Sequence, residues 1–293
     1  MRFNARRGRA ITLKAFAKIN LYLRIVGRRE DGYHLLETVM QTVDVADDIF
    51  LRESEEGINF TCNDPGLEKD NLAVKAAALF YQRLARVPEI SISLHKRIPA
   101  GAGLGGGSSD AAAVLRGLNL LYKNVFDDAA LWEMARCLGA DVPFFLRGGR
   151  ALCTGIGDII TPLPDLVSGA FVLVKPPFSL STATVYSLWD DLVRRGRPGA
   201  NNYLPEQKIN IEYKFINDLE QAVFSVYKDF ACLKAELYEL GADAVVMSGS
   251  GSALFAFFTC QEQAKWAEQV VKDIKSADWW VKFCESARAV VDT

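Results

Sequence analysis

The sequence has 293 residues, of which 50% are hydrophobic and 24% charged, with a formal net charge of −2. This length allows one large or two ordinary domains, each with a hydrophobic core. The small negative charge argues against broad electrostatic attraction to nucleic acid, so an anionic ligand must be held by local groups. Only two histidines are present, which argues against a classical zinc site.

The six cysteines lie far apart in the sequence and form no Cys-x-x-Cys pair. This spacing predicts reduced, mostly buried thiols. No apolar run reaches membrane-spanning length, and the start of the chain lacks a signal-peptide core. We therefore expect a cytoplasmic protein that has neither a membrane nor a nucleic acid as its partner.

The first quarter of the chain is predicted to be mainly β-structure. Leu21, Leu23 and Ile25 alternate with Tyr22 and Arg24, which is the period of two that a strand requires. A polar loop follows at 27–32. Strands are expected at about 11–26, 36–45, 48–52 and 58–62.

Helices and strands mix in the remainder of the chain. Asp70 is the expected N-cap of a helix over about 71–86. The proline-rich stretch 161–164 predicts a boundary between a domain of residues 1–162 and one of residues 163–293. Further elements are expected as strands at about 90–94, 150–154, 158–160, 171–175, 244–247 and 253–258, and helices at about 128–138 and 182–194, with two more between 215 and 240, then a last helix and a last strand.

Residues 99–109, with the sequence Pro-Ala-Gly-Ala-Gly-Leu-Gly-Gly-Gly-Ser-Ser, form what we call the glycine loop. Five glycines within seven residues let backbone N–H groups approach a ligand closely. Val114, Leu115, Leu118 and Leu121 follow at helical spacing. A helix that starts at the loop would point its N-terminal amides and dipole at the same place, which suits a phosphate.

Three other interpretations of the glycine loop are weaker. Its Gly-x-Gly-x-x-Gly match to a dinucleotide fingerprint does not follow a strand directly, because residues 96–99 intervene. A Walker P-loop needs a lysine where Gly107 stands. A flexible linker would not normally open a well-patterned helix.

Two further segments carry candidate catalytic side chains. Lys18 interrupts an apolar strand segment, and Asp141 precedes Pro143 by two residues. Taken alone, Lys18 fits an exposed strand-edge lysine and Asp141 fits a helix cap. Phosphoryl transfer to an alcohol, however, needs a proton acceptor, a cation and a triphosphate cradle. Asp141, Lys18 and the glycine loop supply these three kinds of group.

The order of these motifs resembles that of the GHMP family of small-molecule kinases. The motifs are Ala-Lys-Ile-Asn-Leu at 17–21, the glycine loop, Gly-Ala-Asp-Val-Pro at 139–143, and a second glycine-rich turn at 248–252, which we call the serine–glycine turn. The resemblance covers nearly the whole chain. It implies an α+β fold with two domains, an N-terminal domain like ribosomal protein S5 domain 2 and a C-terminal ferredoxin-like domain, with the active site between them.

Within the family, Gly-Arg-Arg-Glu-Asp-Gly-Tyr-His at 27–34 is similar to kinases that act on a cytidine diphosphate-linked polyol. This similarity implies ATP-dependent phosphorylation of the 2-hydroxyl of the cytidylylated methylerythritol, on the non-mevalonate route to isoprenoid precursors. ATP would be the co-substrate and Mg²⁺ the metal. The implied roles are catalysis for Lys18 and Asp141, ATP binding for Pro99, Ala100, Gly101, Ala102, Gly103, Leu104, Gly105, Gly106, Gly107, Ser108 and Ser109, substrate binding for Asn20, Tyr33, His34 and Tyr186, a position near the phosphates for Gly249, Ser250 and Gly251, and a metal contact for Ser108.

Three rival functions remain open on the sequence. One is a kinase of the same family for another alcohol, such as homoserine or mevalonate, which the Asp-Gly-Tyr-His segment argues against. Another is an ATP-consuming decarboxylase of the same superfamily. The third is a nucleotide-binding regulatory protein without catalysis, which the presence of both Lys18 and Asp141 disfavours.

Overall fold

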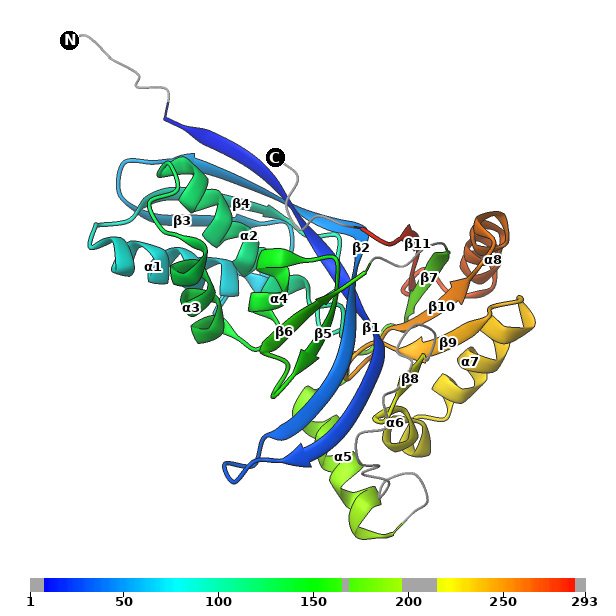
Figure 1. Cartoon of the computed structure of the whole chain (residues 1–293). Helices are drawn as coiled ribbons and strands as arrows, with labels where there is room; N and C mark the ends of the chain where they lie inside the picture. The colour runs from blue at the N-terminus through cyan, green and yellow to red at the C-terminus, as the bar shows by residue number, and fades with distance from the viewer. Residues whose placement is uncertain (1–7, 165–168, 197–214, 288–293) are drawn as a thin grey trace, which may run out of the picture.

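The computed structural model of the chain describes residues 8–164, 169–196 and 215–287. Two sheets organise these residues, and helices cover one side of each (Figure 1). The first sheet has seven strands, in the order β3-β4-β2-β1-β8, with β5 paired to β2 and β6 paired to β5. Its strands are β1 (Ala10–Arg28), β2 (His34–Glu53), β3 (Gly57–Cys62), β4 (Glu89–His95), β5 (Arg150–Thr154), β6 (Ile159–Leu163) and β8 (Ile216–Asn217).

The second sheet has four strands, in the order β11-β7-β10-β9. The chain passes through it as β-α-β-β-α-β, which is the ferredoxin-like order that the sequence predicted. Its strands are β7 (Ala170–Lys175), β9 (Ala244–Met247), β10 (Leu254–Phe258) and β11 (Trp280–Glu285), and its helices are α5 (Thr182–Arg194), α6 (Glu220–Val226), α7 (Asp229–Glu239) and α8 (Gln261–Ile274).

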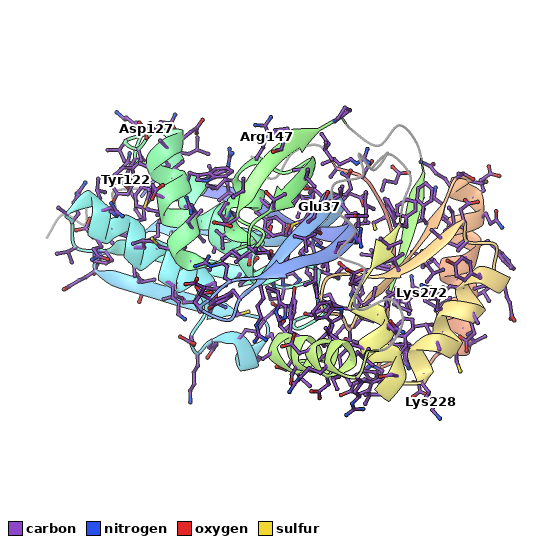
Figure 2. All side chains as sticks on the ribbon, turned by 60° about the horizontal axis from the view of Figure 1, so that its bottom comes forward. Glu37, Tyr122, Asp127, Arg147, Lys228 and Lys272 are labelled. Atoms are coloured by element: carbon purple, nitrogen blue, oxygen red, sulfur yellow. The ribbon has the colours of Figure 1, made fainter. Side chains whose placement is uncertain are left out.

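The first sheet packs against four helices through a continuous apolar core. A second core lies between the four-stranded sheet and its helices, and a third cluster, which includes Ile19, Phe171 and Phe255, joins the two sheets. Charged side chains such as Arg147, Lys228 and Lys272 project from the surface (Figure 2). The four helices on the first sheet are α1 (Leu72–Leu84), α2 (Gly106–Leu121), α3 (Asp128–Leu138) and α4 (Val142–Arg147), and a short 3-10 helix, η1 (Pro65–Leu67), precedes α1 without burying a residue.

The strands β1 and β2 form a long curved ribbon that reaches from the first sheet to α5 (Figure 1). We expected two strands at 36–45 and 48–52, but β2 is continuous. The reason is a bulge: Ala17 pairs with Val43 and Phe16 pairs with Ala46, so Asp44 and the buried Val45 between them are accommodated without ending the strand. The loop that joins the ribbon's strands ends at Tyr33, and His34 directly after it contacts Tyr186 and Asp190 of α5.

Other local predictions need correction. The N-cap of α1 is Asn71, whose side chain accepts a hydrogen bond from the Ala73 amide, whereas Asp70 adopts φ 61° and pairs with Lys75. The thiols are not mostly buried, because Cys137, Cys232 and Cys260 are exposed. Burial does raise the pKa of the Cys153 thiol to about 12.

The predicted domain boundary falls at the end of β6. Pro162 lies within this strand, where a missing N–H is tolerated because β6 pairs on one side only, with β5. The division into 1–162 and 163–293 stays a prediction. In the part of the chain that the structure describes, no helix combines the length and the apolar character needed to cross a bilayer.

Candidate active site

A cavity of about 930 Å³ lies where the two sheets and the glycine loop meet. Most of the residues that the sequence singled out line this cavity. They are Lys18, Asn20, Tyr33, His34, Gly101, Gly103, Gly105, Asp141, Tyr186, Gly249, Ser250 and Gly251. The structure therefore brings together segments that lie more than two hundred residues apart in the sequence, as Lys18 and Gly251 do.

The glycine loop alternates glycines on the cavity with apolar anchors. Gly101, Gly103 and Gly105 have φ values of 63°, 75° and 72°, in the left-handed region that favours glycine. Ala102 and Leu104 between them are buried in the cluster that joins the sheets. The last four residues of the loop, 106–109, already belong to the first turn of α2. The free amides of this turn therefore lie at the loop end of α2, although none of residues 106–109 lines the cavity.

The serine–glycine turn and the residue after it form hydrogen bonds to the glycine loop from the side of the second sheet. The Ser248 hydroxyl donates to the Gly103 carbonyl at 2.9 Å, and the Ala253 amide donates to the Ala102 carbonyl at 3.0 Å. From the first sheet, the Lys18 amide donates to the Leu104 carbonyl at 3.0 Å. The loop is thus fixed by backbone bonds to both sheets, which preorganises a cradle for phosphates.

We expect Gly103→Ala to weaken ATP binding by about tenfold or more. A Cβ atom at this position would lie 2.0 Å from the Ser248 carbonyl oxygen, so the loop and the turn must separate. The left-handed backbone adds about 1–2 kcal/mol of strain for any other residue, and each 1.4 kcal/mol corresponds to about tenfold in a binding constant. Calorimetric titration with ATP measures the effect.

Gly57→Ala is the matched control for this variant. Gly57 has a similar left-handed backbone, with φ 79°, but it does not line the cavity and a Cβ atom there would meet nothing within 4 Å. Its ATP affinity should stay near that of the wild type. Unchanged ATP affinity in folded Gly103→Ala would remove the loop from the nucleotide site.

Lys18 is a buried lysine, because only 3% of the surface of the residue is exposed to solvent. The interpretation as an exposed strand-edge lysine is wrong, because the side chain is buried and the Lys18 amide bonds the Leu104 carbonyl of the glycine loop. The Lys18 ammonium donates to Asn20 Oδ1 at 2.7 Å and to the Gly103 carbonyl at 2.9 Å. Asn20 is itself held, since its Nδ2 donates to Thr38 Oγ1 at 2.8 Å. These bonds aim the ammonium at the cavity.

Asp141 stands at the N-cap position of α4, but its side chain makes no capping hydrogen bond. The capping interpretation is therefore wrong. Instead, Oδ2 lies 3.6 Å from Lys18 Nζ, and the side chain is 33% exposed, so the carboxylate can still meet a ligand. A carboxylate and an ammonium share one wall of the cavity.

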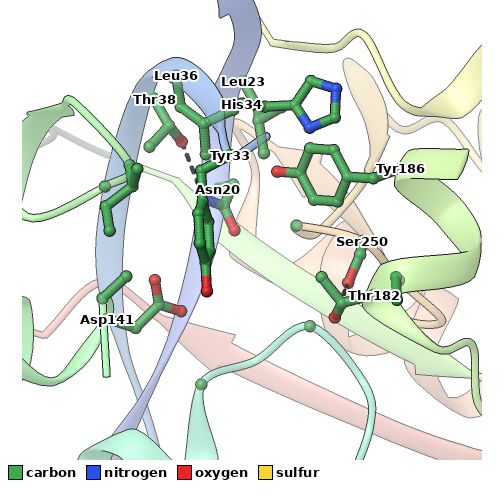
Figure 3. Close-up of a pocket in the computed structure, with 18 of the residues that line it drawn as sticks. Asn20, Leu23, Tyr33, His34, Leu36, Thr38, Asp141, Thr182, Tyr186 and Ser250 are labelled. Atoms are coloured by element: carbon green, nitrogen blue, oxygen red, sulfur yellow. Dashed lines mark hydrogen bonds between the residues drawn. The ribbon is translucent and has the colours of Figure 1, made fainter. Parts of the chain in front are cut away.

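An aromatic group forms another part of the wall. The ring of Tyr186 stacks on that of His34 at a centroid distance of 4.8 Å, and His34 Nε2 lies 2.8 Å from Asp190 Oδ1. Tyr33 is 62% exposed. Figure 3 shows Tyr33 and Tyr186 approaching the same cavity from different sides, with Asp141 beyond the hydroxyl of Tyr33. A flat ring fits such a space.

Behind the glycine loop lies a buried ionic cluster, which consists of Lys96, Asp47 and Asp110. The Lys96 ammonium bonds both carboxylates, at 2.7 Å for Asp110. Asp47 Oδ1 also accepts from the amides of Arg97 and Ile98, at 2.5 and 2.8 Å. Burial raises the pKa of the Asp110 carboxyl to about 7, against the opposing effect of Lys96. The cluster fastens the chain segment that enters the loop.

Two parts of the chain match the models of the two domains of one protein family. Residues 71–149 match the GHMP kinases N-terminal domain, and residues 204–275 match the GHMP kinases C-terminal domain. A 4-diphosphocytidyl-2-C-methyl-D-erythritol kinase of Clostridium botulinum (strain Eklund 17B / Type B) is 40% identical over 254 residues, which cover 85% of this chain and 91% of the relative. The chain belongs to the GHMP kinase family.

Other comparisons agree with this membership. A kinase of the same name from Syntrophomonas wolfei is 41% identical over 262 residues, covering 87% of this chain and 92% of the relative. A crystal structure of 4-(cytidine 5'-diphospho)-2C-methyl-D-erythritol kinase superposes with a TM-score of 0.76 at 32% identity, covering 94% of this chain and 100% of that one. A homoserine kinase from Cytophaga hutchinsonii, at 21% identity and a TM-score of 0.72 over 100% and 99% of the two chains, shows the fold alone.

The expected α+β architecture with two GHMP domains is therefore confirmed, and this GHMP kinase uses ATP as its co-substrate. The sequence missed several residues that shape the site. Ser248 holds the glycine loop, Thr38 holds Asn20, and Asp190 holds His34. For Asp190 a signal existed, because it follows Tyr186 by four residues and so lies on the same face of α5.

Proposed function

We propose that this GHMP kinase transfers the γ-phosphoryl group of ATP to the 2-hydroxyl of 4-diphosphocytidyl-2-C-methyl-D-erythritol, a step in the non-mevalonate synthesis of isoprenoid precursors. The observation that carries the proposal is the Lys18–Asp141 pair on the cavity that the glycine loop and the Tyr33–His34 segment also line. The relatives of the same name at about 40% identity support the substrate. The absence of a nucleic-acid partner and a cytoplasmic location stay predictions of the sequence.

The chemistry follows from three groups. Asp141 accepts the proton of the substrate hydroxyl. The hydroxyl oxygen of the substrate forms a bond to the γ-phosphorus, while the bond between that phosphorus and the leaving oxygen of ADP breaks. Lys18, fixed by Asn20 and the Gly103 carbonyl, stabilises negative charge between the carboxylate and the transferred group. The glycine loop and the first turn of α2 bind the other phosphates through backbone amides.

The described residues also fit a magnesium ion that is held mainly by the nucleotide. None of their His, Cys, Asp and Glu side chains gather in groups of three or more that could hold a metal. Ser108, half-buried in the first turn of α2, would supply a hydroxyl ligand to an ion on the phosphates. Mg²⁺ often keeps several waters and takes few protein ligands. When bound, the ion would neutralise charge on the ATP phosphates.

A substrate panel tests the proposal directly. Purified protein is incubated with ATP, Mg²⁺ and either the cytidylylated alcohol, methylerythritol phosphate, homoserine or mevalonate, while ADP, inorganic phosphate and carbon dioxide are followed. We expect ADP with the cytidylylated alcohol and no carbon dioxide. If methylerythritol phosphate were phosphorylated equally well, the cytidine group would not be part of what the enzyme recognises. Release of carbon dioxide would show that the protein is a decarboxylase. Failure to form ADP with any of them would favour a nucleotide-binding protein.

We expect Tyr33→Ala to raise the KM for the cytidylylated alcohol while the KM for ATP changes little. The lost stacking on the cytosine ring is worth about 1–3 kcal/mol, taking single-strand base stacking as a guide. Because the Tyr33 side chain is largely exposed, its truncation should leave the melting temperature almost unchanged. Initial rates with each substrate varied in turn measure both constants.

Tyr227→Ala is a suitable comparison, because Tyr227 stacks on Phe178 away from the residues that line the cavity. Its loss should lower stability but leave the KM for the cytidylylated alcohol unchanged. If Tyr33→Ala instead raised the KM for ATP, the segment at 31–34 would not be a cytidine pocket, although the kinase assignment would survive.

A further inference from the structure

Asp190 of α5 lies at the edge of the proposed cytidine pocket and is bonded by two residues of the β1–β2 ribbon. Its Oδ1 is 2.8 Å from His34 Nε2, and its Oδ2 is 3.3 Å from Arg28 Nη1. Arg28 and His34 face each other as a cross-strand pair at the end of the ribbon. Both carboxylate oxygens therefore face donors, which is the environment of a carboxylate anion.

An ionised carboxylate can only accept hydrogen bonds, so the contact with Asp190 requires a proton on His34 Nε2. A neutral imidazole carries one N–H, and the bond made by one nitrogen decides the state of the other. Nδ1 is then left with a free lone pair. Among the residues that the structure describes, none makes a hydrogen bond to Nδ1.

The aromatic neighbours hold the ring in this orientation. Tyr186 stacks on the His34 ring at 4.8 Å, and Trp189 meets it edge-on at 5.6 Å. The side chain of His34 is only 10% exposed, yet the residue lines the cavity. A 180° flip of the ring would exchange its two nitrogens and break the contact between Nε2 and Asp190. Nδ1 therefore stays available as an acceptor for a ligand.

We propose that Asp190 is a specificity-positioning residue, which fixes the Nε2–H tautomer of His34 so that Nδ1 accepts a hydrogen bond from the exocyclic amino group of cytosine. This inference rests on the proposed function. Cytosine presents an N–H donor at its fourth ring position, whereas uracil presents a carbonyl acceptor there. An acceptor at Nδ1 therefore favours cytosine and leaves two lone pairs facing each other when uracil is bound.

The first test is made on the ligand-free protein by NMR. Long-range correlation of the histidine ring nitrogens reports which of them carries a proton, and the chain has only two histidines. His95→Gln, at an exposed position, leaves the His34 signals alone in the spectrum. We expect the Nε2–H form in this background and a mixed or reversed form after Asp190→Asn, because an amide can either accept or donate. An Nδ1–H form before that substitution would overturn the inference.

The second test is the ratio of kcat/KM for the cytidine and uridine versions of the substrate. We expect Asp190→Asn to lower this ratio by about tenfold or more, mainly through a higher KM for the cytidine version, because a mixed tautomer of His34 loses part of its hydrogen bond to the cytosine amino group. Asp191→Asn is the matched control, since the neighbouring carboxylate pairs with Arg194 and does not line the cavity. It should keep both the ratio and the His34 signals.

The outcomes separate this inference from the proposed function. If Asp190 only fastened α5 to the ribbon, Asp190→Asn would lower the melting temperature and reduce kcat/KM equally for both versions, and the unchanged ratio would refute the inference while the kinase assignment stood. If the wild type phosphorylated neither version, the proposed function would fall and the inference with it. The NMR result would then describe only the His34–Asp190 pair.

Discussion

Asp141→Asn should lower kcat by about 10²–10⁴ while the fold and the ATP affinity stay intact. An amide has nearly the shape of a carboxylate but cannot take up the proton of the substrate hydroxyl. The Asp141 side chain makes no capping hydrogen bond, so its loss should cost little stability. Rates with the cytidylylated alcohol, ATP titration by calorimetry and thermal unfolding measure the three quantities.

Asp127→Ala provides the contrast for this variant. Asp127 is a true N-cap, whose side chain accepts from the Ala130 amide at 2.8 Å at the start of α3. We expect this variant to lose about 1 kcal/mol of stability and to keep its kcat. The opposite pattern, early melting with near-normal turnover in Asp141→Asn, would contradict the role of Asp141 as the base.

Asp47→Ala should lower the free energy of unfolding by about 3–5 kcal/mol, because it leaves the buried Lys96 ammonium with a weaker set of partners. The side chain of Asp47 is fully buried, and besides Lys96 it accepts from the amides of Arg97 and Ile98. Those amides would be left without acceptors at the entrance to the glycine loop. Denaturant unfolding with and without ATP is the measurement, and we expect the ATP affinity to fall as well.

Asp110→Asn is the matched variant, and its cost should be smaller. One oxygen of Asp110 has no hydrogen-bond partner, and burial raises the pKa of this carboxyl to about 7. The ordinary value is about 3.9, so the folded state binds more protons than the unfolded state between about pH 4 and pH 7. The contribution of Asp110 to stability therefore falls as the pH rises through that window. Asp110→Asn should make the stability depend less on pH in this window. An equal loss of stability in Asp47→Ala and Asp110→Asn would contradict the larger role given to Asp47.

Local sequence patterns predicted many of the secondary-structure elements. The helix expected at about 128–138 is α3 with the same bounds, and the strand expected at about 90–94 is β4. Patterns failed where two local solutions were equally good. Asp70 and Asn71 are both good capping residues, and only the left-handed backbone of Asp70 in the folded chain decides between them. The continuity of β2 was also hidden, because a bulge depends on the partner strand.

The residues of the cavity could likewise be predicted only where a local sequence pattern marked them. Lys18, the glycine loop and Asp141 lie in segments with strong local signals, and the structure brings them together. Ser248 had no such signal, and the spacing of Asp190 from Tyr186 indicated only a shared helix face, because each residue acts through a contact with a distant part of the chain. Their identity follows from tertiary packing, which no periodicity in a single segment records.

The carbonyl oxygen of Gly103 accepts hydrogen bonds from both the Lys18 ammonium and the Ser248 hydroxyl, each at 2.9 Å. A shift of the loop backbone by about an ångström away from its donors would take both contacts beyond hydrogen-bond range. The position of the glycine loop and that of the ammonium beside Asp141 are therefore not independent. A change that moves the loop also releases the ammonium, so in the proposed kinase this single oxygen would link phosphate binding to the charge beside the proton acceptor.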